Sequence, residues 1–268
     1  RKGKSMAILS VGIGLAKDVF AVHGVNEAGK AELVRPAVPR EQLNALVAAL
    51  RPCVIGMEAC SGAHHWARQF QALGHTVRLI APKFVTPYRM SGKRGKNDAA
   101  DAAAICEAVQ RPHMRFVPAK SLEQQSRLMV HRARQGFVEQ RTATLNRIRG
   151  LLSEFGIVLP LKAATVRQRA CECLEDLPGY ANTVIGDLLS EVSRLDERIT
   201  QYDRHIQAMA RDDARAKQLM RLSGIGATTA TCLLAMIGNG HEFDCGRQFA
   251  AWLGLVPRQH SSGGRTVL

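Results

Sequence analysis

The sequence lacks the long apolar segments and the metal-binding motifs that define several common protein classes. No apolar run reaches the roughly 18 residues of a membrane-spanning helix, and no secretory signal peptide is visible. The nine His form no HExxH motif, and the seven Cys include no pair of CxxC motifs. We therefore expect a cytoplasmic protein without membrane contact, whose thiols are reduced and mostly structural.

Acidic residues are scarce relative to basic ones. The 268 residues contain 37 Lys and Arg against 23 Asp and Glu, which gives a net charge of +14. Such an excess indicates a polyanionic partner, and nucleic acid is favoured over a membrane surface. A basic housekeeping protein, such as a ribosomal one, is the alternative, but the regular α/β pattern argues against it.

The amino-terminal part alternates short apolar runs with helical patterns. Strands are predicted at 7–13, 20–25, 32–38, 53–57 and 76–80, and helices at 40–50 and 64–73. Ser61 is the expected cap of the second helix. Three hairpin-linked strands followed by strand–helix alternation favour an RNase H-like α/β fold. A doubly wound nucleotide-binding fold is rejected, because Gly12-Ile13-Gly14 lacks the third glycine of that fingerprint.

The segment Lys93–Glu107 carries the strongest candidate site. Asn97 is the expected N-cap of an Ala-rich helix, on which Asp98 and Asp101 share one face. The two acids are either stabilised by the helix dipole or are oxygen ligands for a divalent cation such as Mg²⁺. A basic loop before them favours the second interpretation, since it would lie beside a phosphate-bearing substrate. Its basic residues are Lys93, Arg94 and Lys96.

Glu58 ends the fourth predicted strand, where ligands gather in open α/β sheets. In isolation it is as readily a salt-bridged carboxylate. In an RNase H-like site the acids come from the first strand, the fourth strand and a late helix. Glu58, Asp98 and Asp101 fill the last two places. The first strand has Gly14 where an acid is expected, and Asp18 lies past the strand end as a poor substitute.

The second half of the chain is predicted to be mainly helical. Long helices are expected at 121–155 and 180–211, which can form an antiparallel hairpin or a coiled coil. Basic residues far outnumber acidic ones on the first helix, which favours contact with nucleic acid or dimer formation over a merely solvated face. The candidate nucleic-acid-binding residues on this helix are Arg132, Arg134 and Arg141.

The carboxy-terminal part contains a glycine turn and a polar end. The turn Gly224-Ile225-Gly226 between two helical patterns resembles a helix-hairpin-helix, in which N–H groups at the second helix face a phosphate. A tight helix–helix turn is the alternative. Ser261 and Ser262 stand beside Gly, Arg and His, so that they form either a nucleophile loop or a flexible polar tail.

Five short stretches carry a resemblance to a known family across nearly the whole chain. In chain order they are Val11–Lys17, Met57–Gly62, Lys96–Ala102, Leu222–Gly226 and Leu253–Arg258. Each is a weak signal alone, but in this order they are specific. They resemble the DEDD-type transposases of the insertion sequence 110 family, in particular its 1111 subgroup, which is related to Piv-type DNA invertases.

The resemblance implies a RuvC-like catalytic domain at 6–118, a helical coiled-coil region at 119–215 and a carboxy-terminal transposase domain at 216–268 that looks truncated. It implies DNA strand cleavage and rejoining during transposition, with Mg²⁺ as the cofactor. The implied partners are DNA at the element ends and target, a structured guide RNA, and further copies of the chain in a dimer or tetramer.

Residue by residue, the resemblance makes Glu58, Asp98 and Asp101 three of the four Mg²⁺-binding acids. It makes Ser262 the nucleophile, with Ser261 as the alternative. Three further nucleic-acid-binding candidates at the carboxy-terminal end are Gly224, Gly226 and Arg258.

Two departures from the family pattern leave alternatives open. The first family Asp falls on Gly14, and the sequence stops soon after Gly264, which together suggest a decayed or truncated copy. One alternative is therefore a catalytically impaired nucleic-acid-binding remnant. Another is a RuvC-like, structure-specific nuclease similar to the Holliday-junction resolvases, which shares the acids and needs no Ser.

Overall fold

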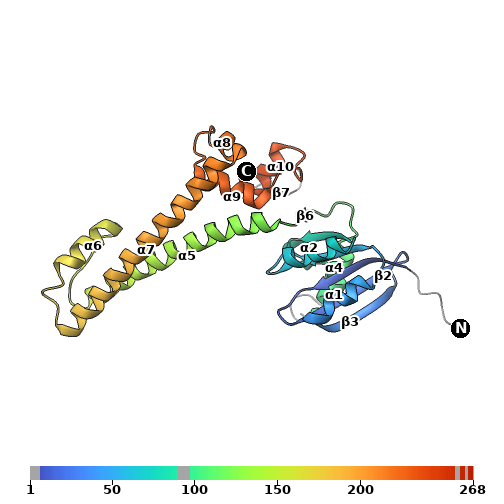
Figure 1. Cartoon of the computed structure of the whole chain (residues 1–268), viewed down its shortest axis with the longest axis horizontal. Helices are drawn as coiled ribbons and strands as arrows, with labels where there is room; N and C mark the ends of the chain where they lie inside the picture. The colour runs from blue at the N-terminus through green and yellow to red at the C-terminus, as the bar shows by residue number, and fades with distance from the viewer. Residues whose placement is uncertain (1–6, 90–96, 257–259, 263–264, 268) are drawn as a thin grey trace. The chain divides into compact units, whose positions relative to one another are not determined.

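The computed structural model describes residues 7–89, 97–256, 260–262 and 265–267. The chain divides into two compact units, Arg1–Ser121 and Leu122–Leu268. The first unit is mixed α/β and the second is mainly helical, which confirms the predicted fold class at this level (Figure 1). The finer division into three domains stays a prediction.

The first unit is built on a six-stranded sheet in the order β3-β2-β1-β4-β5-β6. Strand β1 pairs antiparallel with β2 and parallel with β4, and β5 continues the parallel direction. The strands are β1 Ile8–Gly14, β2 Val19–Asn26, β3 Ala31–Pro39, β4 Val54–Glu58, β5 Thr76–Ile80 and β6 Phe116–Val117. The helices are α1 Arg40–Ala48, α2 Ala63–Ala72, α3 Pro82–Val85, α4 Asp98–Ala108 and the 3₁₀ turn η1 Thr86–Tyr88.

Alternate residues of β1 face opposite sides of the sheet. Val11 and Ile13 are fully buried in a core that includes Leu43 of α1 and Phe70 of α2. Ser10 instead faces α4, where the Cys106 sulfur lies 3.7 Å from its hydroxyl oxygen. Helices α1 and α2 therefore cover one face of the sheet, and α4 covers the other.

Helix α4 rests directly on two glycines of the sheet. A Cβ atom on Gly12 would lie 2.1 Å from the carbonyl oxygen of Ala102 and 2.4 Å from the nitrogen of Cys106. A Cβ atom on Gly56 of β4 would lie 2.9 Å from the Cβ of Val109. No side chain fits at Gly12, so the helix backbone itself contacts the strand there.

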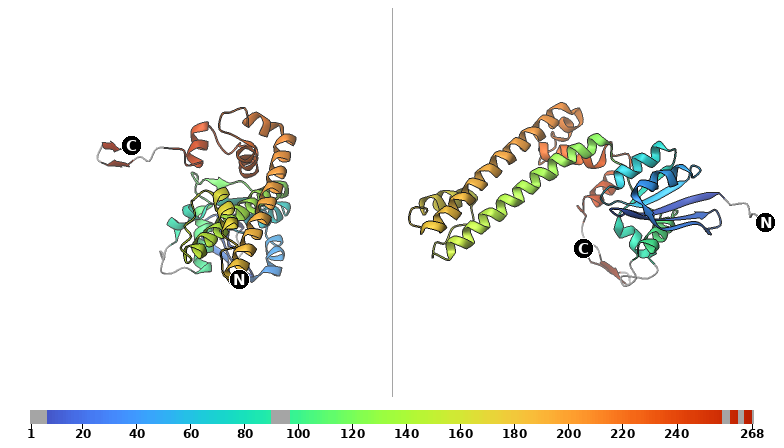
Figure 2. Two further views of the ribbon diagram at one scale, coloured as in Figure 1. Left: turned by 90° about the vertical axis from the view of Figure 1, so that its left-hand side faces the viewer. Right: turned by 60° about the horizontal axis from the view of Figure 1, so that its bottom comes forward.

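The second unit is formed around two long antiparallel helices that run side by side (Figures 1 and 2). Its elements are α5 Leu122–Ser153, α6 Ala163–Glu172, α7 Gly179–Asp212, α8 Ala214–Leu219, α9 Ala227–Ile237, α10 Gly246–Trp252, β7 His260–Ser262 and β8 Arg265–Val267. Helix α6 packs at one end of the long pair, and α8 and α9 pack at the other. Within the described residues, no helix is long and apolar enough to cross a membrane.

Two local expectations are wrong, and some helices, α6 among them, were not predicted. Ser61 does not cap α2, because the N-cap is Gly62 with φ of 82° and no side-chain hydrogen bond. Ser261 and Ser262 lie in neither a loop nor an irregular tail, because both belong to β7, which pairs with β8. Helix α6 was missed because this short segment buries only Val166 and Ala170 and so shows little apolar periodicity.

We expect Gly12→Ala to destabilise the first unit by more than about 3 kcal/mol, because backbone atoms of α4 would have to move. Gly14→Ala is the matched control on the same strand and face, since its new Cβ would come no closer than 3.3 Å to any atom. The control should change stability by less than about 1 kcal/mol. Urea unfolding followed by circular dichroism measures both, and equal losses would contradict the direct contact of α4 with β1.

Candidate active site

Position 14, Glu58 and the first turn of α4 meet at the carboxyl ends of the two central strands β1 and β4. Strands β1 and β4 are parallel, with Gly12 opposite Gly56, so Gly14 and Glu58 occupy equivalent positions at their carboxyl ends. Both lie on the face that α4 covers. A Cβ atom on residue 14 would lie 3.3 Å from the carbonyl oxygen of Asp98. The sequence-predicted acids therefore come to the same end of the sheet as position 14.

The start of α4 is fixed by the predicted cap. The Asn97 side-chain oxygen accepts a hydrogen bond of 2.7 Å from the N–H of Ala100, as expected for an N-cap. Asp98 and Asp101 both fall in the first turn, where the helix dipole favours negative charge. Asp98 is exposed, whereas Asp101 is buried against the sheet.

The guanidinium group of Arg89 lies between two of the acids. Its Nη2 is 2.9 Å from Oε1 of Glu58, and its Nε is 2.8 Å from Oδ1 of Asp101. The side chains of Arg89, Glu58 and Asp101 are 20%, 19% and 12% exposed. This low exposure strengthens their attraction. Two carboxylates from different elements are thus already directed at one cation.

The contact between Arg89 and Asp101 is an ion pair without hydrogen-bond geometry. Oδ1 of Asp101 and Nε of Arg89 are buried, and neither has a hydrogen-bond partner, so their contact is ionic only. A buried carboxylate oxygen without a donor is unfavourable, and it retains capacity for another ligand. No three His, Cys, Asp or Glu side chains in the described part of the chain are grouped closely enough to hold a metal ion.

Arg89 was not singled out from the sequence. It stands directly after η1 and is separated in the chain from both of its partners. The only sequence signal is its place just before the basic loop of Lys93, Arg94 and Lys96, and that loop lies outside the described residues.

The candidate nucleic-acid-binding arginines of α5 have different surroundings. Arg134 contacts both carboxylate oxygens of Asp203 at 2.6 and 3.3 Å, and Arg141 contacts Asp196 at 2.8 Å. These ion pairs connect α5 to α7 and neutralise both arginines locally. Arg132 is exposed and has no ion-pair partner among the described residues. That the three bind nucleic acid stays a prediction.

The remaining predicted residues lie in the carboxy-terminal part. Gly224 has a φ of 84°, which favours glycine, and Gly226 is the N-cap of α9. In the β7–β8 pair, Ser262 is opposite Arg265. Arg258 lies outside the described residues.

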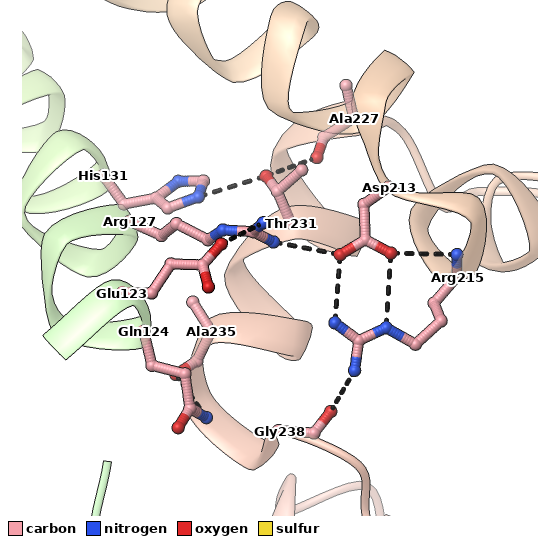
Figure 3. Close-up of polar contacts among 10 residues, drawn as sticks. All are labelled: Glu123, Gln124, Arg127, His131, Asp213, Arg215, Ala227, Thr231, Ala235 and Gly238. Carbon is pink, nitrogen blue, oxygen red and sulfur yellow. Dashed lines mark hydrogen bonds and ion pairs between the residues drawn. The ribbon is translucent and has the colours of Figure 1, made fainter. Parts of the chain in front are cut away.

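A polar network, which sequence analysis also missed, fastens α8 and α9 to the start of α5 (Figure 3). Asp213, between α7 and α8, accepts hydrogen bonds of 2.9 Å from Arg127 and 3.0 Å from Arg215. Hydrogen bonds from Arg215, and after them the one from Arg127, hold the pKa of the Asp213 carboxyl far below its ordinary value. Arg127 also pairs with Glu123 at 2.7 Å, so its charge is shared between two acids.

A second contact in Figure 3 joins α5 to α9 through His131. Its Nε2 is 3.1 Å from the hydroxyl oxygen of Thr231, which is itself 2.8 Å from the carbonyl oxygen of Ala227. Because the Thr231 hydroxyl donates to Ala227, we assign the donated proton of the first contact to Nε2 of His131. Burial, with the nearby charge of Arg134, lowers the pKa of His131, so the ring is neutral at pH 7.

Two protein-family models match the chain. Residues 11–157 match a model of IS110-type DEDD proteins described as "Transposase". Residues 216–267 match a model described as "Transposase IS116/IS110/IS902 family". The first match contains Gly14, Glu58, Asp98 and Asp101, and the second contains Ser262.

Curated relatives agree with these matches. A "Probable family 20 transposase" of Pseudomonas aeruginosa is 45% identical over 98% of this chain and 78% of its own length. A "Transposase for insertion sequence element IS1111A" of Coxiella burnetii is 39% identical over 100% of this chain and 73% of its own length. A "Pilin gene-inverting protein" of Moraxella lacunata is 26% identical over 74% of this chain and 53% of its own length.

We expect Asp213→Asn to destabilise the second unit by about 1–3 kcal/mol at neutral pH, because Arg127 and Arg215 lose their shared carboxylate. The folded-state pKa of Asp213 is depressed. The stabilisation is therefore complete above the unfolded carboxyl pKa of about 4 and is lost as the pH falls below it. Urea unfolding of both proteins across acidic pH measures this difference.

The neighbouring Asp212→Asn is the matched control, because Asp212 is exposed and has no ion-pair partner among the described residues. It should have little effect at any pH. A difference between wild type and Asp213→Asn that persists unchanged at strongly acidic pH would contradict the role given to the carboxylate.

Proposed function

The chain belongs to the insertion sequence 110 family of transposases, and from this we propose that it cleaves and rejoins DNA at insertion-sequence ends, using Mg²⁺ bound by Glu58, Asp98 and Asp101. Transposases are enzymes that cut and join DNA strands. The observation that carries the proposal is the convergence of Glu58 and Asp101 on one cation beside position 14.

The sheet topology supports an RNase H-like, RuvC-related first domain in this proposal. Three antiparallel strands are followed by β4 and β5, which run parallel to β1. The turn at Gly224–Gly226, which leads into α9, supports a helix-hairpin-helix that binds a backbone phosphate.

We propose a site for one divalent cation rather than two, which the three acids would complete only on binding, since no three acids of the described residues are already grouped closely enough to hold an ion. Glu58 and Asp101 offer carboxylate oxygens at one point, Asp98 lies in the same helical turn, and Gly14 offers no side-chain oxygen. Mg²⁺, when bound there, would offset the charge that develops on the phosphate in the transition state. Arg89 has to release at least one of its acids and is then free to pair with a phosphate oxygen.

Ser262 is the proposed nucleophile, with Ser261 as the alternative. Its hydroxyl oxygen would bond to phosphorus while the bond from phosphorus to one sugar oxygen breaks. The hydroxyl proton has to pass to a base, and the leaving sugar oxygen has to gain a proton. The reaction therefore requires β7 to reach a phosphodiester that is bound at the acids.

The proposal also includes a structured guide RNA and a dimer or tetramer. The net charge of +14 supports binding of nucleic acid through its backbone. Two alternatives remain: an inactive nucleic-acid-binding remnant, which Gly14 favours, and a structure-specific nuclease that uses the acids without Ser262.

The chain and its Gly14→Asp variant should differ in the rate at which they cleave element-end DNA, measured with Mg²⁺ and the guide RNA present. We expect the variant to cut at least about tenfold faster, since it adds a carboxylate next to Asp98. Gly14→Asn is the control of equal size without charge. Equal rates for Asp and Asn would contradict the missing-ligand interpretation.

The same assay separates the two enzyme hypotheses. Loss of cutting in Ser262→Ala, with cutting retained in Ser261→Ala, is expected for the transposase. Full cutting by Ser262→Ala with loss in Ser261→Ala would move the nucleophile to Ser261. Full cutting by both variants would favour the nuclease.

Arg89→Gln should bind Mg²⁺ or Mn²⁺ about tenfold more tightly than wild type, because the ion no longer competes with a guanidinium group. Without metal, the same variant should unfold at a lower temperature, since the ion pairs of Arg89 with Glu58 and Asp101 are lost. Calorimetric titration and thermal unfolding measure these effects. Arg89→Lys keeps the charge and should stay close to wild type. Equal metal affinity in all three proteins would show that Arg89 does not occupy the cation position.

A further inference from the structure

A small pocket lies where α7 ends and α8 follows. It has a volume of about 220 Å³ and is lined by Gln207, Ala210, Arg211, Lys217, Met220 and Arg221. Three of its six lining residues are cationic, and none is acidic. Ala210 and Met220 contribute apolar surface between them, and the amide of Gln207 adds a neutral hydrogen-bond donor.

In the described part of the chain, the three cations of this pocket lack the carboxylate partners that several other arginines of the second unit have. Arg134, Arg141 and Arg194 of the long helices, and Arg167 of α6, all have carboxylate partners on α7. Arg211, Lys217 and Arg221 are exposed, and none has an ion-pair partner among the described residues. The positive charge gathered at the pocket is therefore not compensated by neighbouring side chains.

The nearby acids do not neutralise the pocket. Asp213 is occupied by Arg127 and Arg215, which lie outside the pocket lining. Asp212 is exposed and pairs with no cation in the part of the chain that the structure describes. Helix α8 thus uses one of its cations, Arg215, for the network of Figure 3 and leaves the other, Lys217, in the pocket.

A purely structural explanation covers only part of this arrangement. Arg211 and Lys217 lie in the last turns of α7 and α8, where positive charge is favourable to the helix dipole. That effect does not require both residues to face one pocket. It also does not account for Arg221, which lies beyond the end of α8.

We propose that this pocket binds a phosphate group of a nucleic-acid backbone. Arg211 and Arg221 would donate paired N–H groups to the phosphate oxygens, and Lys217 would add a point charge. Met220 would lie against the adjoining sugar. This inference rests on the proposed function, because it specifies one contact through which the second unit holds DNA or guide RNA.

The test compares the full-length chain with the double variant Lys217→Gln/Arg221→Gln. The control, Arg111→Gln/Arg194→Gln, removes the same charge from exposed arginines that are already paired with Glu107 and Glu191. Fluorescence anisotropy measures binding to a labelled DNA duplex of random sequence and to a labelled RNA strand, over a range of salt concentrations. Circular dichroism checks that both variants are folded.

We expect the pocket variant to lose about tenfold in affinity at low salt and to reduce the slope of log K against log salt by about 1. The control should lose less than about twofold. A loss on duplex DNA alone, on RNA alone, or on both supports the site and identifies its ligand. Equal behaviour of pocket variant and control on both probes overturns it.

This experiment separates the inference from the proposed function. If wild type binds neither DNA nor RNA in a salt-sensitive manner, the proposed function fails and the pocket proposal fails with it. If wild type binds and the pocket variant binds equally well, only the pocket proposal is wrong.

Discussion

The direct contact between α4 and the glycines of the sheet determines where the acids lie. Since no Cβ fits at Gly12, the backbone of α4 itself contacts β1 there. That approach brings the first turn of α4 over the carboxyl ends of β1 and β4, so Asp101 and Glu58 reach the same guanidinium group. A larger residue at Gly12 or Gly56 would displace α4 from the sheet. It would therefore change the distance between Asp101 and Glu58 without contacting either acid.

Arg89 stabilises two of the acids by pairing with both of them. Two partly buried carboxylates would repel each other, and one guanidinium group offsets that repulsion. These three side chains together carry one net negative charge, and Asp98 is exposed in the same helical turn as Asp101. The same residue that holds the acids in place therefore also competes with the ion they are proposed to bind.

The parts of the fold that follow local rules were predictable from the sequence. The five main strands follow apolar runs, and Asn97 has the side chain and position of an N-cap. The partners of Arg134 and Arg141 were not predictable, because Asp203 and Asp196 lie far along the chain on another helix. Two arginines of a helix face that appears basic in sequence are therefore neutralised by acids of α7 in the folded protein.

The candidate site was predictable as a set of acids but not as a geometry. Glu58, Asp98 and Asp101 stand out by their places at a strand end and a helix start, and Gly14 by the absence of an acid. Arg89 could not be found in this way, because the sequence around an arginine in a short turn does not indicate which acids it contacts. Its role depends on the tertiary fold, as does the network around Asp213.

The two long helices also make the second unit modular. The chain enters this antiparallel arm at Leu122 and leaves it at Asp212, and the ion pair of Arg127 with Asp213 joins entry to exit at 2.9 Å. Helices α8 and α9 are attached at this base, whereas α6 belongs to the far tip. Matched turns could be added to or removed from both helices near the tip without disturbing the base. The length of the two long helices can thus change without changing the contacts that hold α8 and α9 at their base.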